Sequence, residues 1–141
     1  MQNILVLCIG NICRSPLAEV LLAREFPDKT IRSAGLGALV GEPADPLSVA
    51  LALEQGLDLS MHRAQQVNSL MCQRAELILV MEDDHRFALE QRYPFVQGRV
   101  FRLADRDIAD PFRLKRRAFE AAYADIARGV TDWAARIRQL G

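Results

Sequence analysis

The segment from Cys8 to Ser15 groups the residue types of phosphate chemistry within eight positions, CIGNICRS. A cysteine thiolate is a strong nucleophile, and the planar guanidinium of Arg14 can hold two phosphate oxygens at once. Gly10 and Asn11 both tolerate left-handed backbone angles, so the N–H groups between Cys8 and Arg14 can curl inward around an anion. The segment therefore predicts a phosphate-binding loop in which Cys8 attacks phosphorus.

The residues on either side of this loop predict how it is held. Residues 4–7, ILVL, form a short apolar run that indicates a strand buried on both faces. Ser15 and Pro16 predict a helix start, with Ser15 as N-cap and Pro16 at the first helical position. Free N–H groups and the positive dipole end at such a start favour an anion and favour the thiolate form of a nearby cysteine. Ser15 can also donate a hydrogen bond to the sulfur of Cys8 when that sulfur becomes a leaving group.

Strand and helix patterns alternate along the rest of the chain. Further strands are expected at residues 30–34, 76–81 and 99–103, and helices after Asp45-Pro46, at 67–74, from Asp83 or Asp84, and at 119–140. Gly129 inside the last helix lowers helix propensity by about 1 kcal/mol relative to alanine. This order predicts one α/β domain, residues 1–141, with three layers: a four-stranded parallel sheet flanked by helices on both faces. Ligands of such sheets bind beyond the carboxyl ends of the strands, which is where Cys8 lies.

Composition excludes several classes of function. The 18 basic and 18 acidic residues balance, so nothing indicates nucleic acid as a partner. The start of the chain does not read as a signal peptide and no apolar run reaches about 18 residues, so we expect a cytoplasmic protein without stable membrane insertion. Three cysteines are too few for a secreted disulfide scaffold, and no Cys/His spacing fits zinc. Neither a metal nor an organic cofactor is implied.

The order Cys, five residues, Arg, Ser resembles the signature of cysteine-dependent phosphatases. Its place at the N-terminus, with GNIC inside the loop and PLAE after it, is similar to the low-molecular-weight protein tyrosine phosphatases. Residues 33–35, SAG, and Asp110-Pro111 also match, so the resemblance covers essentially the whole chain. Residues 35–41 resemble the bacterial branch linked to capsule and exopolysaccharide production. The resemblance implies hydrolysis of phosphotyrosine through a cysteinyl-phosphate, on a phosphotyrosine protein that is typically a bacterial tyrosine autokinase.

This resemblance also implies roles for residues outside Cys8 and Arg14. Asp110 is expected to be the general acid that protonates the departing tyrosine oxygen, ahead of Asp105 and Asp107, and Pro111 restricts its backbone. The phosphate-binding loop comprises Ile9, Gly10, Asn11, Ile12, Cys13 and Ser15. A hydrogen-bonded network that supports the loop comprises Asn11, Ser33, His62 and Glu19. Leu39 and Phe112 line the substrate pocket, and Cys13 is placed to form a reversible disulfide with Cys8.

Each of these residues also has a plainer structural interpretation. Cys8 alone could be an inert buried thiol, Leu39 and Phe112 could belong to the core, and Glu19 and His62 could be caps or surface groups. Glu82 stands where the family usually has aspartate, so a supporting role does not carry over to it directly. The basic residues between 113 and 117 are a solvated face, or a surface for an acidic phosphotyrosine segment.

Three other functions fit parts of the pattern. An arsenate reductase of the same fold needs two further cysteines near Cys72, where this chain offers one. A protein-arginine phosphatase has threonine in the loop where this chain has Ile12. A non-catalytic phosphotyrosine-binding module would not need Asp110.

Overall fold

The computed structural model describes residues 1–140, which form one four-stranded parallel sheet in the order β2-β1-β3-β4. The strands are β1 (Asn3–Cys8), β2 (Thr30–Gly35), β3 (Leu77–Val80) and β4 (Val100–Arg102). Because all three strand pairs are parallel, every strand ends at the same edge of the sheet. Cys8 lies at that edge, opposite Gly35 of β2.

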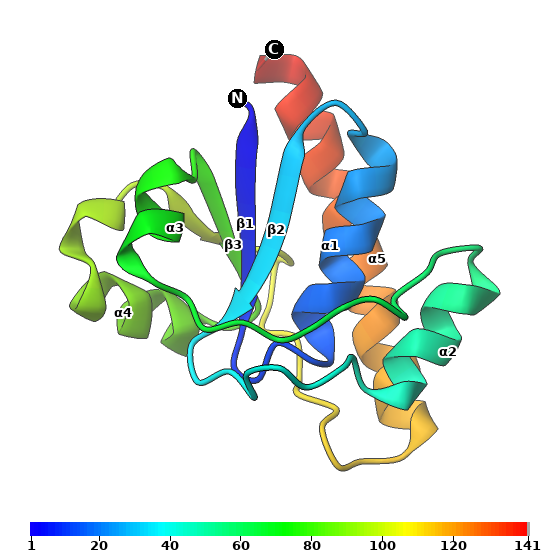
Figure 1. Ribbon diagram of the computed structural model, residues 1–141. Helices are drawn as coiled ribbons and strands as arrows, with labels where there is room; N and C mark the ends of the chain where they lie inside the picture. Colours follow the sequence, from blue (N-terminus) through cyan, green and yellow to red (C-terminus); the bar gives the residue numbers. More distant parts are fainter. Residues whose placement is uncertain (141) are drawn as a thin grey trace.

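Helices cover both faces of the sheet (Figure 1). On one side lie α1 (Arg14–Glu25) and α5 (Arg116–Leu140), with α2 (Pro46–Glu54) packed against both of them. On the other side lie α3 (Ser69–Arg74) and α4 (Asp83–Arg92), followed by a short 3-10 helix, η1 (Pro94–Val96), that the sequence did not indicate. The expected fold class, a parallel sheet between two helical layers, is confirmed.

Alternate residues of β1 build the two apolar clusters of the core. Ile4, Val6 and Cys8 join the cluster under α1 and α5, whereas Leu5 and Leu7 join the cluster under α3 and α4. A strand buried on both faces is what the unbroken apolar run predicts. Cys72 is fully buried in the second cluster, where burial raises its pKa to about 11.

The first helix does not begin as the sequence predicted. It starts at Arg14 with Cys13 as N-cap, and Ser15 is not the cap. The reason is that the Ser15 hydroxyl is used inside the loop, where it bonds Cys8 Sγ and accepts from Asn11. The N-terminal N–H groups of the helix thus receive no side-chain cap. Pro16 still lies in the first turn, where its missing N–H is tolerated.

Other helix boundaries agree more closely with expectation. The Asp45 side chain caps α2 by accepting from Leu47 N–H at 2.9 Å, as predicted. The short helix begins at Ser69, two residues later than expected, because Asn68 caps it by accepting from Met71 N–H.

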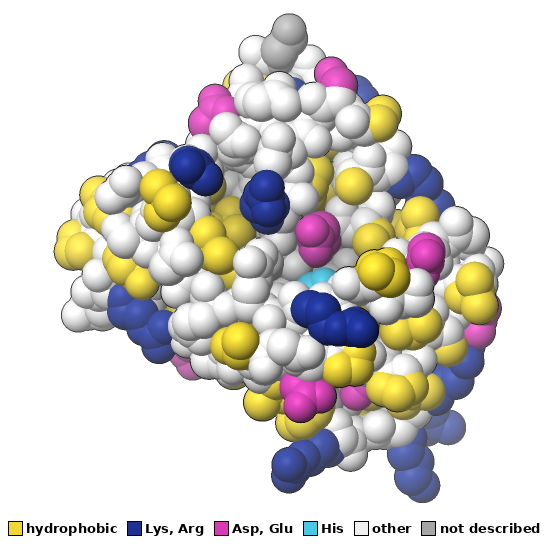
Figure 2. Space-filling model, in the orientation of Figure 1, with side chains coloured by type: hydrophobic (Ala, Val, Ile, Leu, Met, Phe, Trp, Pro, Cys, Tyr) yellow, Lys and Arg dark blue, Asp and Glu magenta, His cyan; other side chains and the backbone are white. Residues whose placement is uncertain are grey.

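Figure 2 shows charged side chains on one face of the molecule. Lys and Arg side chains lie scattered among acidic and hydrophobic ones on that face. Within residues 1–140, no helix combines the length and apolar character that crossing a membrane requires.

Gly129 has a packing role that its helix propensity does not reveal. A Cβ at this position would lie 2.7 Å from the carbonyl oxygen of Leu103 and 3.0 Å from its Cγ. Backbone cannot move aside as a flexible side chain can, so the glycine lets α5 approach the end of β4 closely.

We therefore expect Gly129→Ala to lower the free energy of unfolding by about 1–2 kcal/mol, because overpacking outweighs the gain in helix propensity. Urea denaturation measures the change. Ala135→Gly, at an exposed position of the same helix, measures how much helix propensity alone changes the free energy of unfolding. A Gly129→Ala protein more stable than the wild type would contradict the close approach.

Candidate active site

The loop after β1 curls at the edge where the strands end. Asn11 has φ of 61°, in the left-handed region, whereas Gly10 is not among the positive-φ residues. The curl therefore depends on Asn11. Both residues were expected to tolerate left-handed angles, but only Asn11 adopts them. A Cβ added at Gly10 would meet the Leu39 side chain at 3.8 Å, which is an ordinary contact.

Cys8 is buried at the floor of this loop and its sulfur receives two hydrogen-bonding groups. Ser15 Oγ lies 2.9 Å from Cys8 Sγ, and Asn11 N–H donates to Cys8 Sγ at 3.3 Å. Because Ser15 Oγ already accepts a bond from the Asn11 side chain at 2.8 Å, its own hydrogen is free to point at the sulfur. Donors at this position can stabilise negative charge on the sulfur when it acts as a nucleophile or leaving group.

Arg14 is 1% exposed, and its guanidinium is anchored at one nitrogen. Nη1 donates to Glu82 Oε2 and to the Ile108 carbonyl, both at 2.6 Å. Nη2 lies 3.8 Å from Asp110 Oδ2. Fixing Nη1 in this way leaves the remaining donors of the planar group for an anion in the loop.

Sequence reasoning did not assign Glu82 to the site, yet the structure brings it against Arg14. The signal was its position: Glu82 is the second residue after β3, and β3 is the neighbour of β1. Side chains after adjacent parallel strands meet at one edge. No sequence pattern could have pointed to the Ile108 carbonyl, because every residue has a backbone carbonyl.

The segment that carries Asp110 is tied to the end of β3. Ile108 N–H donates to the Met81 carbonyl at 2.9 Å. Asp107 Oδ1 accepts from Asp83 N–H at 3.0 Å and from Arg102 at 3.1 Å, and these bonds hold the pKa of Asp107 below its usual range. Asp107 is thereby occupied as a tether for the segment.

Asp110 is the aspartate that reaches the cavity beside Cys8. Its Oδ1 accepts from Phe112 N–H at 3.1 Å, and its side chain remains 45% exposed. The structure thus separates Asp110, at the cavity, from Asp107, which is engaged elsewhere.

The polar residues proposed to support the loop lie together. Asn11 Nδ2 donates to Ser15 Oγ and, at 3.0 Å, to Ser33 Oγ, which donates to Glu19 Oε1 at 2.6 Å. His62 Nε2 lies 2.7 Å from the Asn11 carbonyl, and its Nδ1 lies 4.0 Å from Glu19 Oε1. Burial raises the pKa of Glu19, although the Ser33 bond and then His62 oppose this.

Gln65 belongs to the same network and was missed. Its N–H donates to Asn11 Oδ1 and its side chain donates to the Ser33 carbonyl, each at 2.9 Å. Gln65 stands in an irregular segment with no motif around it, so the sequence carried no signal for it.

The cavity above Cys8 has a volume of about 130 Å³. Most of the expected loop and pocket residues line it: Cys8, Ile9, Gly10, Ile12, Cys13, Arg14, Leu39, Asp110 and Phe112. Gly37, which was not expected, also lines it, whereas Asn11 and Ser15 of the loop do not. Ile9, Leu39 and Phe112 are partly exposed at its mouth, so they are not core residues. Apolar side chains above Cys8 and Arg14 suit an aromatic group that carries an anion at its end.

Cys13 lines the same cavity as Cys8 but differs in character. All three cysteines are free thiols, and Cys13 Sγ makes only a long contact, 3.9 Å, to Asp45. Burial, followed by the charges of Asp45 and Asp110, raises the pKa of Cys13 far above its ordinary value. Cys13 is therefore held as a thiol, and a disulfide with Cys8 stays a prediction.

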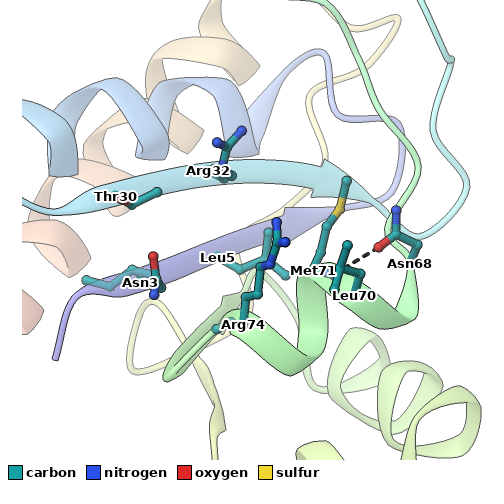
Figure 3. Close-up of a pocket in the computed structure, with 10 residues that line it drawn as sticks. Asn3, Leu5, Thr30, Arg32, Asn68, Leu70, Met71 and Arg74 are labelled. Atoms are coloured by element: carbon teal, nitrogen blue, oxygen red, sulfur yellow. Dashed lines mark hydrogen bonds between the residues drawn. The ribbon is translucent and has the colours of Figure 1, made fainter.

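A second and larger groove, of about 240 Å³, lies between α3 and the beginnings of β1 and β2 (Figure 3). Its lining includes Asn3, Leu5, Thr30, Arg32, Asn68, Leu70, Met71 and Arg74. None of these is a nucleophilic cysteine or a carboxylate. No cluster of three or more potential metal ligands occurs within residues 1–140 either. The cavity above Cys8 is thus the candidate active site.

The raised pKa of Glu19 predicts a pH effect on stability. Folded Glu19 binds its proton more tightly than the unfolded residue, whose ordinary pKa is 4.5, so its contribution becomes unfavourable as pH rises above that value. We expect the stability of wild type relative to Glu19→Gln to fall between about pH 4.5 and 7, because Gln still accepts from Ser33. Urea denaturation of both proteins across this range measures the difference between their free energies of unfolding. If wild type instead gains stability relative to Glu19→Gln as pH rises, the burial effect is contradicted.

Comparison with known proteins agrees with this geometry. Residues 3–140 match the family described as low molecular weight phosphotyrosine protein phosphatase. EpsP of Ralstonia nicotianae, a probable low molecular weight protein-tyrosine-phosphatase, is 49% identical over 100% of this chain and 99% of its own length.

Solved structures show the same relationship. Vibrio vulnificus Wzb in complex with benzylphosphonate superposes with a TM-score of 0.92 at 40% identity, covering 96% of this chain and 98% of that one. The YwlE arginine phosphatase from Geobacillus stearothermophilus also reaches 0.92, at 29% identity, covering 99% of this chain and 94% of its own. The resemblance inferred from the loop is confirmed: the chain belongs to the low molecular weight phosphotyrosine protein phosphatase family.

Proposed function

We propose that this member of the family hydrolyses phosphotyrosine in proteins through a cysteinyl-phosphate on Cys8. The observation that carries the proposal is the convergence of Cys8, Arg14 and Asp110 on one cavity with an apolar mouth. These three residues supply a nucleophile, a fixed cation and a proton donor, which are the groups that transfer of a phosphoryl group from an aryl oxygen requires.

In the first step the Cys8 thiolate attacks phosphorus. The S–P bond forms as the bond from phosphorus to the tyrosine oxygen breaks, and Asp110 gives its proton to that oxygen. Arg14 and the loop N–H groups interact with the three equatorial oxygens, whose charge they stabilise in the transition state. The anchored Nη1 of Arg14 keeps the guanidinium from having to reorganise during the reaction.

In the second step water displaces the sulfur. Asp110, now a carboxylate, takes a proton from the water as its oxygen bonds to phosphorus, and the S–P bond breaks. Ser15, 2.9 Å from Cys8 Sγ, donates to the departing thiolate. Inorganic phosphate leaves and Cys8 returns to its starting form.

The walls of the cavity favour tyrosine over the alternatives. Ile12 is nearly buried and presents an apolar side chain, which suits an aromatic ring better than the polar guanidinium of phosphoarginine. An arsenate reductase would relay electrons between cysteines, but Cys72 belongs to the core cluster on the opposite face of the sheet from Cys8. The exposed Asp110 is a feature that a non-catalytic binding module would not need.

A tyrosine autokinase of exopolysaccharide or capsule production is the partner that we propose. Residues 35–41, whose pattern resembles that bacterial branch, supply Gly37 and Leu39 to the cavity wall. Arg113 places its guanidinium carbon 5.3 Å from the centre of the Phe112 ring, at the mouth, where it can meet an acidic segment beside the phosphotyrosine. Arg116, by contrast, is paired with Glu54 and Glu120.

The reaction is tested by a substrate panel. We expect the wild type to hydrolyse phosphotyrosine peptides at least about 100-fold faster than phosphoserine or phosphoarginine peptides, without reducing arsenate, and Cys8→Ser to release no phosphate. Arg14→Ala should lose activity by a similar order, with both variants still folded by circular dichroism. Arg74→Ala, outside the site, is the control. Full activity of Cys8→Ser would exclude the covalent mechanism, and a preference for phosphoarginine would favour the alternative.

The proton donor is tested by the leaving group. Asp110→Asn should slow aryl phosphates with poor leaving groups by about 100-fold or more, while those with good leaving groups, which need no proton, lose much less. Asp105→Asn, an exposed neighbour, serves as the matched control. If Asp110→Asn slows both classes equally, Asp110 is not the general acid.

A further inference from the structure

A buried histidine stands behind Arg14, outside the proposed catalytic groups. His85 lies in the first turn of α4, is 4% exposed, and places Nε2 3.4 Å from Glu82 Oε2. The same carboxylate oxygen accepts from Arg14 Nη1 at 2.6 Å. Two side-chain nitrogens on different elements, α1 and α4, therefore converge on one oxygen of Glu82.

The surroundings of His85 indicate which of its ring nitrogens carries the hydrogen. Its Nδ1 is buried without a hydrogen-bond partner among residues 1–140, so a hydrogen on that nitrogen would be unsatisfied. Glu82 offers an acceptor to the other nitrogen, which places the hydrogen on Nε2. Burial and then Arg14 lower the pKa of His85, whereas the charges of Glu82, Asp107 and Asp110 oppose this. His85 is accordingly a neutral donor near pH 7.

Glu82 needs such a donor to hold one orientation. Its side chain has three rotatable bonds and is 29% exposed, so water competes for the carboxylate. Arg14 cannot supply the constraint, because the guanidinium is itself the group to be positioned. The His85 ring, by contrast, is buried and approaches the carboxylate from the protein interior.

We propose that His85 is a positioning residue that, acting through Glu82, fixes the orientation in which Arg14 meets phosphate. This rests on the proposed function only in taking Arg14 as the phosphate ligand. The chain of contacts is short: His85 Nε2 lies 3.4 Å from Glu82 Oε2, and the same oxygen accepts from Arg14 Nη1 at 2.6 Å.

A double-mutant cycle tests the proposal, using wild type, His85→Leu, Glu82→Ala, which removes the acceptor, and the double variant. The readouts are kcat/KM for an aryl phosphate and the Kd for inorganic phosphate. We expect His85→Leu to lower kcat/KM and weaken phosphate binding by roughly tenfold in the wild-type background, and by less than about twofold beside Glu82→Ala. His85→Gln, whose amide N–H can still donate, should recover most of the loss. Phe87→Leu, at an exposed position of α4, is the matched control.

Equal losses from His85→Leu in both backgrounds would overturn the proposal, since a purely structural role is additive. No loss in the wild-type background would overturn it as well. Should the variants fold poorly by thermal denaturation, nitrogen NMR of the wild-type His85 ring decides: a neutral ring protonated at Nε2 is expected, and an Nδ1–H or cationic ring contradicts it. Failure of the wild type to hydrolyse any aryl phosphate would instead refute the proposed function, while the phosphate-binding cycle would still test His85.

Discussion

The arrangement of the site depends on the buried amide of Asn11. Its backbone takes the left-handed conformation that curls the loop, its Nδ2 donates to Ser15 and Ser33, and its Oδ1 accepts from Gln65. The side chain is fully buried, so every one of these bonds replaces a bond to water that folding removed. An unsatisfied group there would cost about 1–3 kcal/mol, which is why the polar residues around it act as one unit.

Around this loop, the end of β3 organises the remaining parts. Residues just after β3 provide the carboxylate that anchors Arg14 and the Met81 carbonyl that holds Ile108, and Ile108 in turn gives its own carbonyl to Arg14. The cation and the segment bearing Asp110 are thus positioned by neighbouring atoms of one strand end. This shared anchor keeps their geometry matched.

Much of the fold was predictable because its signals are local. Continuous apolar runs, the Asp45 cap and the three- and four-residue spacing in α5 each reflect interactions within a few residues. Prediction failed where a long-range contact competed with a local one. Ser15 has the residue type of an N-cap, but Cys8 and Asn11 take its hydroxyl. The helix through Gly129 was predicted correctly, but the reason for a glycine there was not: the backbone of Leu103 leaves no space for a side chain.

The sequence by itself determined the chemistry, because Cys8, Arg14 and Ser15 lie within eight positions and a strand-to-helix loop of that length must bring them together. Only the tertiary structure decided which groups surround them. It distinguishes Asp110 from Asp107 and brings Glu82 and His85 behind Arg14, which lies 68 positions before Glu82. Such contacts arise where separate parallel strands end at a common edge, and sequence spacing does not encode which side chains meet there.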